Sequence, residues 1–242
     1  MFNQAHINHS RISDGLRLFK LIGSLSLLFF LVACSSNQLS LGGSEKKANP
    51  DEIVLDEKGL PSIAQLMKAG PLPEMYLGKE NAPVTIIEYV SLTCPHCRAF
   101  HLKTFPLLKR DYIDKGKVRY IVREFPIGRS AGNAAIVTRC GSPKRYFKLV
   151  DLFLNNQPKW VSQEVRLDAI YAVAQKSGLK RAEFDQCMKD QVLIDNLNKI
   201  KNRGRKLGVS GTPTFFINGQ KIRKPLSIDE LKVLIDTHMK QS

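Results

Sequence analysis

Two cysteines separated by two residues, Cys94 and Cys97, constrain this 242-residue chain more than any other feature. Residues 84–90 before them form a largely apolar and β-branched run, which is typical of a strand buried on both faces. After them, apolar residues recur at roughly helical spacing between Phe100 and Leu108. The pair is therefore predicted to lie where a buried strand leads into a helix.

Such a junction favours a negatively charged sulfur at Cys94. The first turn of a helix has amide groups without intrahelical partners, and the positive end of the helix dipole lies there. Pro95 suits the first helical position because it has no amide hydrogen, and His96 adds a cation when it is protonated. In such places the pKa of cysteine falls from ~8.5 to roughly 3.5–7.5. The pair can therefore cycle between dithiol and disulfide, with Cys94 as the attacking thiolate.

A metal site is the alternative chemistry for the same residues. Four possible ligands lie close together in the sequence, namely Cys94, His96, Cys97 and His101. Closed structural zinc sites usually take their ligands from two separated segments, and three ligands within four positions fit one ion poorly. We therefore predict redox chemistry, with no metal and with no cofactor other than the redox-active Cys94–Cys97 disulfide itself.

Two segments resemble the DsbA family of thioredoxin-fold oxidoreductases. One runs from Gly78 to Glu124 and contains Cys-Pro-His-Cys, and the other runs from Val209 to Gly219 and contains Gly-Thr-Pro. The resemblance covers about residues 77–242. It implies an α/β thioredoxin fold with an inserted α-helical domain, in which Cys94 is the exposed nucleophile and Cys97 the buried, resolving cysteine.

The same resemblance implies roles for three further residues. Pro213 is expected to be cis and to pack beside the redox pair, and Thr212 to offer backbone groups to an extended substrate peptide. An ordinary edge-strand proline remains the alternative for Pro213, because the apolar run 214–217 follows it and proline donates no ladder hydrogen bond. Glu88 is expected beneath Cys97 as the acid that takes its proton. The alternative for Glu88 is a strand residue that faces the surface.

Residues 1–33 are predicted to be a targeting segment. A basic start is followed by 13 uncharged and mostly apolar residues that end at Ala33, too few to span a membrane and typical of a signal peptide. Residues 31–34 resemble a bacterial lipobox, in which the cysteine, here Cys34, becomes the lipidated N-terminus. A soluble signal peptide with a chance cysteine is the alternative. With lipidation, the protein is expected in the cell envelope, periplasmic and anchored to the inner or the outer membrane.

Cys140 and Cys187 remain once the other three cysteines have been assigned. An exported protein meets an oxidising compartment, which favours pairing of these two. A bridge between them would span 47 positions, which corresponds to about 4 kcal/mol in the chain-entropy model. Two buried free thiols are the alternative.

The rest of the chain is predicted to divide into a tether, an extension and one domain with an insertion. Residues 34–50 are rich in Ser, Gly, Asn and Lys, as flexible tethers are. Residues 51–76 are expected outside the core, as a surface appendage, a packed extension or a dimerisation arm. The two halves of the thioredoxin domain are predicted at 77–126 and 207–242, and the helical insertion at 127–206.

Local patterns predict the order of elements within this domain. Amphipathic stretches at 146–154 and 167–174 predict helices of the insertion. Asn218-Gly219 is typical of a two-residue hairpin turn, and Ser227 begins a capping box at the start of the last helix. The remaining predicted elements are a strand at 84–90, a helix at 95–115, a strand at 117–124, a strand at 214–217 and a short strand at 220–223.

The chain is strongly basic, with a formal net charge of +15. Eight Lys and Arg residues and no acidic residue lie between positions 196 and 224, on both sides of Pro213. Part of this run could hold an anionic sulfur; the alternatives are attraction to anionic lipid headgroups and simple solubility. A nucleic-acid partner is not expected, because elements that read grooves or stack on bases and a cytosolic address are both missing.

These features predict three candidate functions. The first is a thiol:disulfide oxidase that introduces disulfide bonds into exported, cysteine-containing proteins and is reoxidised by a membrane partner, as the resemblance implies. The second is a disulfide isomerase or reductase, because Thr212 stands where the best-studied oxidases of the family carry valine. The third is a lipid-anchored surface protein whose thioredoxin fold has no catalytic role, against which the intact Cys-Pro-His-Cys and Gly-Thr-Pro sequences argue.

Overall fold

The computed structural model describes residues 53, 56–57 and 61–240. The predicted signal peptide at 1–33, the tether and Cys34 lie outside the described residues. None of the helices in the described part is long and apolar enough to span a membrane.

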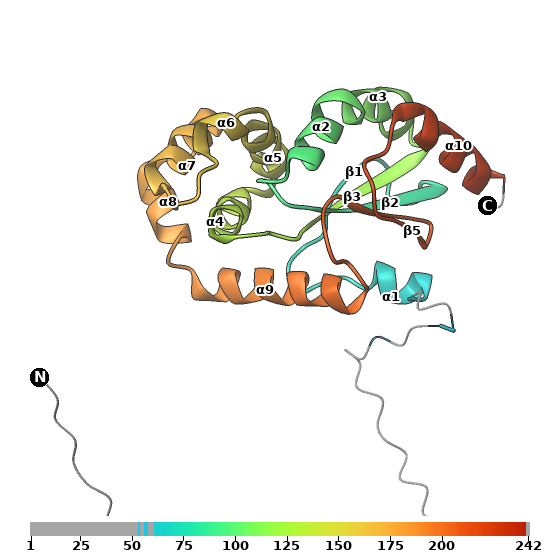
Figure 1. Ribbon diagram of the computed structural model, residues 1–242, viewed down its shortest axis with the longest axis horizontal. Coiled ribbons are helices and arrows are strands. Elements are labelled where there is room, and N and C mark those ends of the chain that lie inside the picture. Colours follow the sequence, from blue (N-terminus) through green and yellow to red (C-terminus); the bar gives the residue numbers. More distant parts are fainter. Residues whose placement is uncertain (1–52, 54–55, 58–60, 241–242) are drawn as a thin grey trace, which may run out of the picture. The chain divides into compact units, whose positions relative to one another are not determined.

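A five-stranded sheet forms the centre of the domain (Figure 1). The two central strands, β2 and β3, are parallel, and every other neighbouring pair is antiparallel. The predicted strands agree with the observed ones to within one residue at each end. In spatial order the strands are β1 (Met75–Leu77), β3 (Val118–Glu124), β2 (Val84–Val90), β4 (Thr214–Ile217) and β5 (Gln220–Ile222).

Helices cover both faces of this sheet (Figure 1). One face carries α2 (Pro95–Lys103), α3 (Phe105–Leu108) and α10 (Ile228–Met239), and the other carries α1 (Ile63–Met67) and α9 (Gln191–Lys206). The crossover from β2 through α2 and α3 to the parallel strand β3 therefore lies on the first face. This arrangement sets the start of α2 at the end of the central strand.

Side chains of β2 alternate between two apolar cores. Ile86 and Val90 belong to the larger core, which includes residues of α2, α3 and α10, whereas Ile87 and Tyr89 belong to the smaller core next to α1 and α9. Glu88 is in phase with Ile86 and Val90, so it points toward the face that α2 covers. Burial of both faces explains why the sequence of β2 shows no alternation of polar and apolar residues.

Helix α9 lies very close to the sheet at Gly204. A Cβ atom at this position would come within 2.7 Å of Tyr89 Cε1 and 3.1 Å of the Phe125 ring. The absence of a side chain at Gly204 is therefore what allows the helix to approach the smaller core. Although residues 191–206 were predicted within the helical insertion, this helix also packs against the thioredoxin sheet.

The helical insertion packs beside the sheet, and its buried aromatic side chains, such as Trp160 and Phe153, belong to the larger core. Within the insertion, the helix predicted at 167–174 is followed by a short turn. This turn ends at Gly178, which has the left-handed conformation with φ 90°. The helices and turns of this region are α4 (Arg129–Thr138), η2 (Pro143–Arg145), α5 (Tyr146–Asn155), α6 (Gln157–Trp160), α7 (Leu167–Ala174), η3 (Gln175–Ser177) and α8 (Arg181–Cys187).

The single helix predicted at 95–115 is wrong in its continuity. The chain is divided at Thr104, and α3 and a π-helical turn, η1 (Lys109–Ile113), complete the segment. Pro106 explains the division, because proline has no amide hydrogen and its ring would clash with a carbonyl of the preceding turn. At the division, the Thr104 hydroxyl donates a hydrogen bond to the carbonyl oxygen of Leu226 at 3.0 Å.

The expectation that residues 51–76 lie outside the core is wrong for the described part of this segment, which fits the alternative of a packed extension instead of a surface appendage. Leu66 of α1 is 1% exposed and belongs to the smaller core. Met75 and Tyr76 pair with β3 as part of the edge strand β1. A three-residue strand is too short to show a recognisable period, which is why the sequence did not predict it.

Candidate active site

Cys94 is the N-cap residue of α2, directly above a buried partner. The amide of Cys97 donates to Cys94 Sγ at 3.4 Å, and the Cys94 thiol donates to the carbonyl oxygen of Thr212 at 3.1 Å. Cys94 is half-buried, whereas Cys97 is 0% exposed, and both are free thiols in this structure. The site thus presents one accessible sulfur and protects the other.

The surroundings separate the two thiols chemically. A hydrogen bond from the Cys97 side chain is the largest cause that lowers the pKa of Cys94 to about 5; the Thr212 side chain and the amides of Cys97 and His96 add to it, against the effect of burial. Burial is the main cause that raises the pKa of Cys97 far above its ordinary value. Cys94 is therefore suited to attack as a thiolate, whereas Cys97 must lose a proton before it can react.

Pro95 and His96 occupy the first turn of α2. Pro95 is its first residue, where no amide hydrogen is required. The His96 side chain is exposed and has no hydrogen bond or ion pair with any residue of the described part. Its backbone amide does contribute to the lowered pKa of Cys94. The cationic contribution of the His96 imidazole stays a prediction.

The loop before β4 reaches the cysteine pair from the other side. The peptide bond between Thr212 and Pro213 is cis, and Pro213 is buried. The Thr212 hydroxyl is buried and has no hydrogen-bond partner among the described residues, although the Thr212 side chain helps to lower the pKa of Cys94. The structure therefore brings together the two motifs, which are more than a hundred residues apart in sequence.

Glu88 lies in the core below the pair and is 4% exposed, so the surface-facing alternative is wrong. Its carboxylate accepts a hydrogen bond from the Tyr120 hydroxyl. Burial is the main cause that raises the pKa of Glu88 to about 7; the bond from Tyr120 opposes this, and the negative charge of Cys94 adds to it. A carboxyl group with this pKa can give or take a proton near neutral pH. Sequence reasoning missed Tyr120, which looks like an ordinary aromatic residue of a strand.

Gln157 of α6 is a second residue that sequence reasoning missed. Its side-chain amide is buried and donates to the carbonyl oxygens of Leu92 at 2.7 Å and Cys94 at 3.0 Å. The helical insertion thus holds the loop that carries the reactive cysteine. No signal in the sequence could have shown this, because 63 positions separate Gln157 from Cys94.

Known proteins share both this fold and the sequence around it. The Thioredoxin family model matches residues 72–237. A Rickettsia conorii protein named "Putative protein-disulfide oxidoreductase" is 30% identical over 211 residues, which cover 85% of this chain and 72% of that protein. The crystal structure of α-DsbA1 from Wolbachia pipientis is 32% identical with a TM-score of 0.68, and the match covers 74% of this chain and 97% of that one. The chain belongs to the DsbA family.

The matches cover different shares of the relatives' lengths. A Rickettsia felis protein, also named "Putative protein-disulfide oxidoreductase", is 33% identical over 173 residues. This match covers 69% of the DsbA-family chain and 61% of the relative. The chain therefore spans less than two thirds of the length of that relative.

His101, the fourth member of the alternative metal site, contacts Asp151 and Phe105. Its Nε2 atom lies 2.9 Å from Asp151 Oδ1, and its ring stacks on Phe105. Within the residues that the structure describes, no group of three or more His, Cys, Asp or Glu side chains is arranged to hold a metal ion.

The Lys and Arg residues between positions 196 and 224 form a surface away from the Cys94 sulfur. Arg223 Nη2 lies 3.0 Å from the carbonyl of Gly208, which joins the end of β5 to the end of α9. Lys224 pairs with Glu230, whereas the other seven cations have no carboxylate partner in the described part of the chain. None of them is among the groups that most affect the pKa of Cys94, so a role in holding the sulfur anion is not supported. The basic surface comprises Lys199, Lys201, Arg203, Arg205, Lys206, Lys221 and Arg223.

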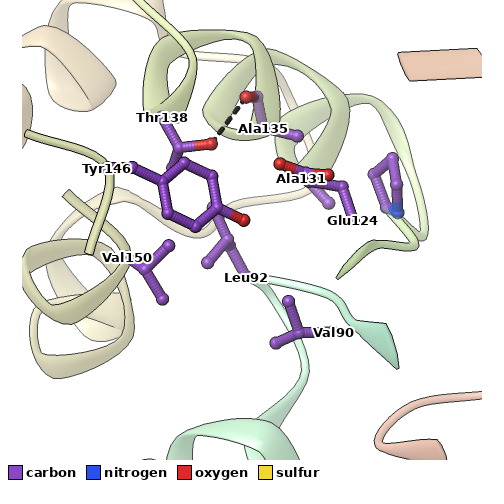
Figure 2. A pocket seen from close by; sticks show the side chains of 9 residues that line it. Val90, Leu92, Glu124, Ala131, Ala135, Thr138, Tyr146 and Val150 are labelled. Carbon is purple, nitrogen blue, oxygen red and sulfur yellow. Dashed lines mark hydrogen bonds between the residues drawn. The ribbon is translucent and has the colours of Figure 1, made fainter. Parts of the chain in front are cut away.

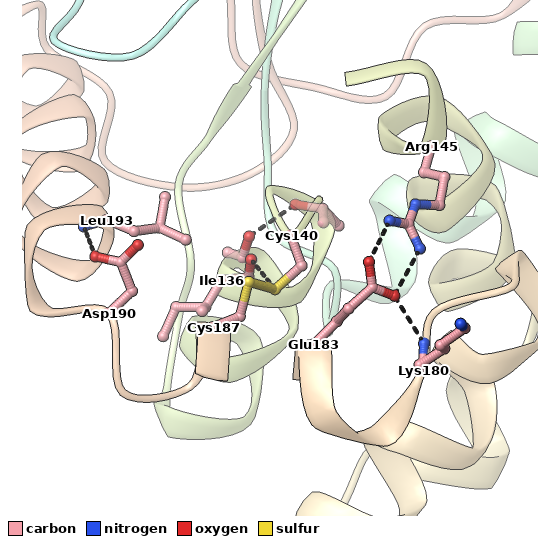
Figure 3. Close-up of a disulfide and its surroundings, with 10 residues drawn as sticks. Ile136, Cys140, Arg145, Lys180, Glu183, Cys187, Asp190 and Leu193 are labelled. Atoms are coloured by element: carbon pink, nitrogen blue, oxygen red, sulfur yellow. Dashed lines mark hydrogen bonds and ion pairs between the residues drawn. A yellow bond between two sulfur atoms is a disulfide. The ribbon is translucent and has the colours of Figure 1, made fainter. Parts of the chain in front are cut away.

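Cys140 and Cys187 form a disulfide in the structure of the DsbA-family chain (Figure 3). Their Cα atoms are 5.9 Å apart, a distance typical of disulfides. The bond joins the segment after α4 to the last residue of α8. An ion pair between Arg145 and Glu183, at 3.0 Å, joins the segment before α5 to the same helix α8.

A small cavity lies between the end of β2 and the insertion (Figure 2). Its volume is about 10 Å³, and Tyr146, Val150 and Leu92 are among the side chains that line it. It has room for at most one water molecule. Substrate of the DsbA-family chain is therefore expected at the open side of Cys94 rather than in this cavity.

Proposed function

We propose that this protein is a thiol:disulfide oxidoreductase that introduces disulfide bonds into exported proteins. The observation that carries the proposal is the opposite shift of the two pKa values, lowered to about 5 for Cys94 and raised for Cys97. Each unit of depression stabilises the thiolate by about 1.4 kcal/mol, which corresponds to about 30 mV for a two-electron couple. Stabilising the reduced form makes the disulfide a stronger oxidant, and the names of the Rickettsia relatives support the same chemistry.

The reaction begins with the oxidised Cys94–Cys97 pair. A substrate thiolate attacks Cys94 Sγ, the bond between the two cysteines breaks, and Cys97 leaves with the electron pair and accepts a proton from Glu88. A second substrate thiolate then attacks the substrate sulfur of the mixed disulfide, and Cys94 leaves as a stable thiolate. Two substrate thiols are oxidised and the pair is reduced. A membrane partner that accepts two electrons would then reoxidise the Cys94–Cys97 pair. This disulfide is the redox group of the reaction.

Substitution of the nucleophile tests the enzymatic proposal. Cys94→Ala should abolish oxidation of a reduced, unfolded test protein. Cys97→Ala is first loaded at Cys94 with an aromatic disulfide reagent; a substrate thiolate that attacks Cys94 Sγ then releases the aromatic thiolate, and the mixed disulfide between Cys94 and substrate should be visible on a non-reducing gel. Cys140→Ala combined with Cys187→Ala is the matched control, because these cysteines are bonded to each other and not to Cys94 or Cys97. Undiminished oxidation by Cys94→Ala would contradict the proposal and favour a non-catalytic surface protein.

A disulfide isomerase or reductase is the second candidate, favoured by the position of Thr212 against Cys94. The reduction potential of the purified protein separates the two. A value of about −120 mV would indicate an oxidant, and a value of about −270 mV would indicate a reductant. A mostly reduced pair in the cell envelope would also favour the second candidate.

We also propose a periplasmic location with lipid attached at Cys34. The signal-like segment and the lipobox-like residues before Cys34 support this proposal. The basic surface supports it independently, because juxtamembrane cations are attracted to anionic lipid headgroups. Exported cysteine-containing proteins and a membrane reoxidase would both be within reach of an enzyme held there.

A further inference from the structure

Tyr120 lies in the same core layer as Glu88 and Cys97. In the sheet register it pairs with Ile86, so its side chain is diagonal to Glu88, two residues further along β2. Its hydroxyl donates to Glu88 Oε2. Glu88, Cys97 and Tyr120 are 4%, 0% and 2% exposed, so water does not solvate any of them substantially.

This hydrogen bond stands alone at the Glu88 carboxylate. Among the described residues, Tyr120 is the one side chain that donates a hydrogen bond to Glu88. Its ring is held by Phe105 of α3, with the ring centres 5.1 Å apart. A donor to a buried carboxylate favours the charged form, whereas burial favours the neutral form. The two effects compete at Glu88, and without Tyr120 only burial and the nearby sulfur charges would remain.

The other titratable groups near this carboxyl are few. Cys94 and Cys97 face it from α2, and Tyr146 of α5 interacts with its charge. The neighbour on β4 in the sheet register is the apolar residue Phe215. No cation is among the groups that most affect the pKa of Glu88. A neutral hydroxyl is therefore the group that stabilises the carboxylate when it forms.

We propose that Tyr120 is a positioning residue that holds Glu88 for proton exchange with Cys97. The inference rests on the proposed function. When substrate opens the disulfide, Cys97 leaves with the electron pair and takes a proton from the Glu88 carboxyl, and Tyr120 donates to the carboxylate that results. During reoxidation the carboxylate takes the proton from the Cys97 thiol, while the Cys97 sulfur attacks Cys94 Sγ in the mixed disulfide with the oxidising partner. The bond from Cys94 to the partner sulfur breaks, and the partner leaves as a thiolate with the electron pair.

Tyr120→Phe tests this role, because it keeps the buried ring and removes only the hydroxyl. The reduced protein is mixed with an aromatic disulfide reagent, which loads Cys94; attack by Cys97 then releases a second coloured thiolate. The pH at which this second rate is half-maximal should move up by about one unit in the variant, because a lost hydrogen bond to a charged group is worth about that much. Near neutral pH the second rate should fall by about fivefold.

Two further variants make the test specific. Tyr89→Phe is the matched control: Tyr89 is adjacent to Glu88, 0% exposed, and its hydroxyl accepts from Arg123 in the other core. It should leave the pH of half-maximal rate unchanged. In a Glu88→Gln background, Tyr120→Phe should have no further effect on the pH profile.

The outcomes are distinguishable from failure of the proposed function. An unshifted profile for Tyr120→Phe, together with a shifted or flattened one for Glu88→Gln, would overturn the role of Tyr120. An unaltered profile for Glu88→Gln would overturn proton exchange by Glu88 itself, and the role of Tyr120 with it. The proposed function fails only if Cys94→Ala still oxidises the test protein.

Discussion

Most of the groups that affect the Cys94 sulfur favour its charge, and burial opposes them. An amide of the first turn of α2 donates to it, and the protonated Cys97 and the Thr212 side chain lower its pKa further. No cationic side chain is among the main causes, although the sequence led us to expect one from His96. The start of the helix and the second cysteine are thus sufficient to explain a thiolate at neutral pH.

The first prediction concerns the pH dependence of stability in the reduced protein. The folded pKa of Cys94 is about 5, below the value of ~8.5 expected when unfolded. Cys94 should therefore contribute no stability below about pH 5, an increasing amount as pH rises to about 8.5, and a constant amount above it. The free energy of unfolding is measured with urea under reducing conditions for the unchanged protein and for Cys94→Ser. As the pH rises, the value for the unchanged protein should increase relative to that for Cys94→Ser. Parallel curves would contradict the low pKa.

Individual residues differ in how far their sequence revealed them. Cys94 and Cys97 could be recognised because their spacing and the strand before them are local features. Tyr120 and Gln157 could not, because their contacts depend on a diagonal between strands and on the packing of an inserted helix. Such contacts follow from tertiary structure and leave no mark in residue spacing.

Among the elements, those with a continuous pattern were predicted best. Strands β2 and β4 agree residue for residue with their apolar runs. The capping box at Ser227 begins α10 as predicted. The break at Thr104 and the edge strand β1 were missed, because a proline was overlooked within a helical pattern and a three-residue strand has too few positions to show a period.

Helix α9 gives the second prediction. Alanine normally stabilises a helix by about 1 kcal/mol relative to glycine, but a Cβ at position 204 would overlap Tyr89. Gly204→Ala should therefore lower the free energy of unfolding by about 1–3 kcal/mol, as overpacked cores do. The measurement is urea unfolding of the purified protein.

Gly132 of α4 is the matched control for this change. A Cβ there would meet nothing within 4 Å, so Gly132→Ala should be neutral or stabilising by up to about 1 kcal/mol. Equal effects of the two substitutions would show that the approach of α9 to the sheet is not as close as described.

In the whole molecule, the redox site and the basic surface belong to different regions. Cys94 begins a helix on one face of the sheet, whereas α9, which carries most of the basic surface, covers the other (Figure 1). Seven cations without carboxylate partners in the described residues suit an anionic membrane.

The third prediction tests the proposed lipid attachment at Cys34 in cells that process bacterial lipoproteins. The full-length protein should incorporate labelled fatty acid and stay in the membrane fraction after a high-salt wash, which screens the attraction of surface charges. Cys34→Ser should lose the label and be released by the wash. A Cys34→Ser protein that stays membrane-bound in high salt would contradict lipid anchoring at this position.

The contact of Gln157 with the two carbonyl groups beside Cys94 limits how this protein can be redesigned. The inserted helices are not a removable module, since deleting them would leave the Leu92 carbonyl without the Gln157 donor and the Cys94 carbonyl with the Arg98 amide alone. Grafting the Cys-Pro-His-Cys loop onto a bare thioredoxin scaffold would therefore transfer the cysteines without the support that fixes their backbone.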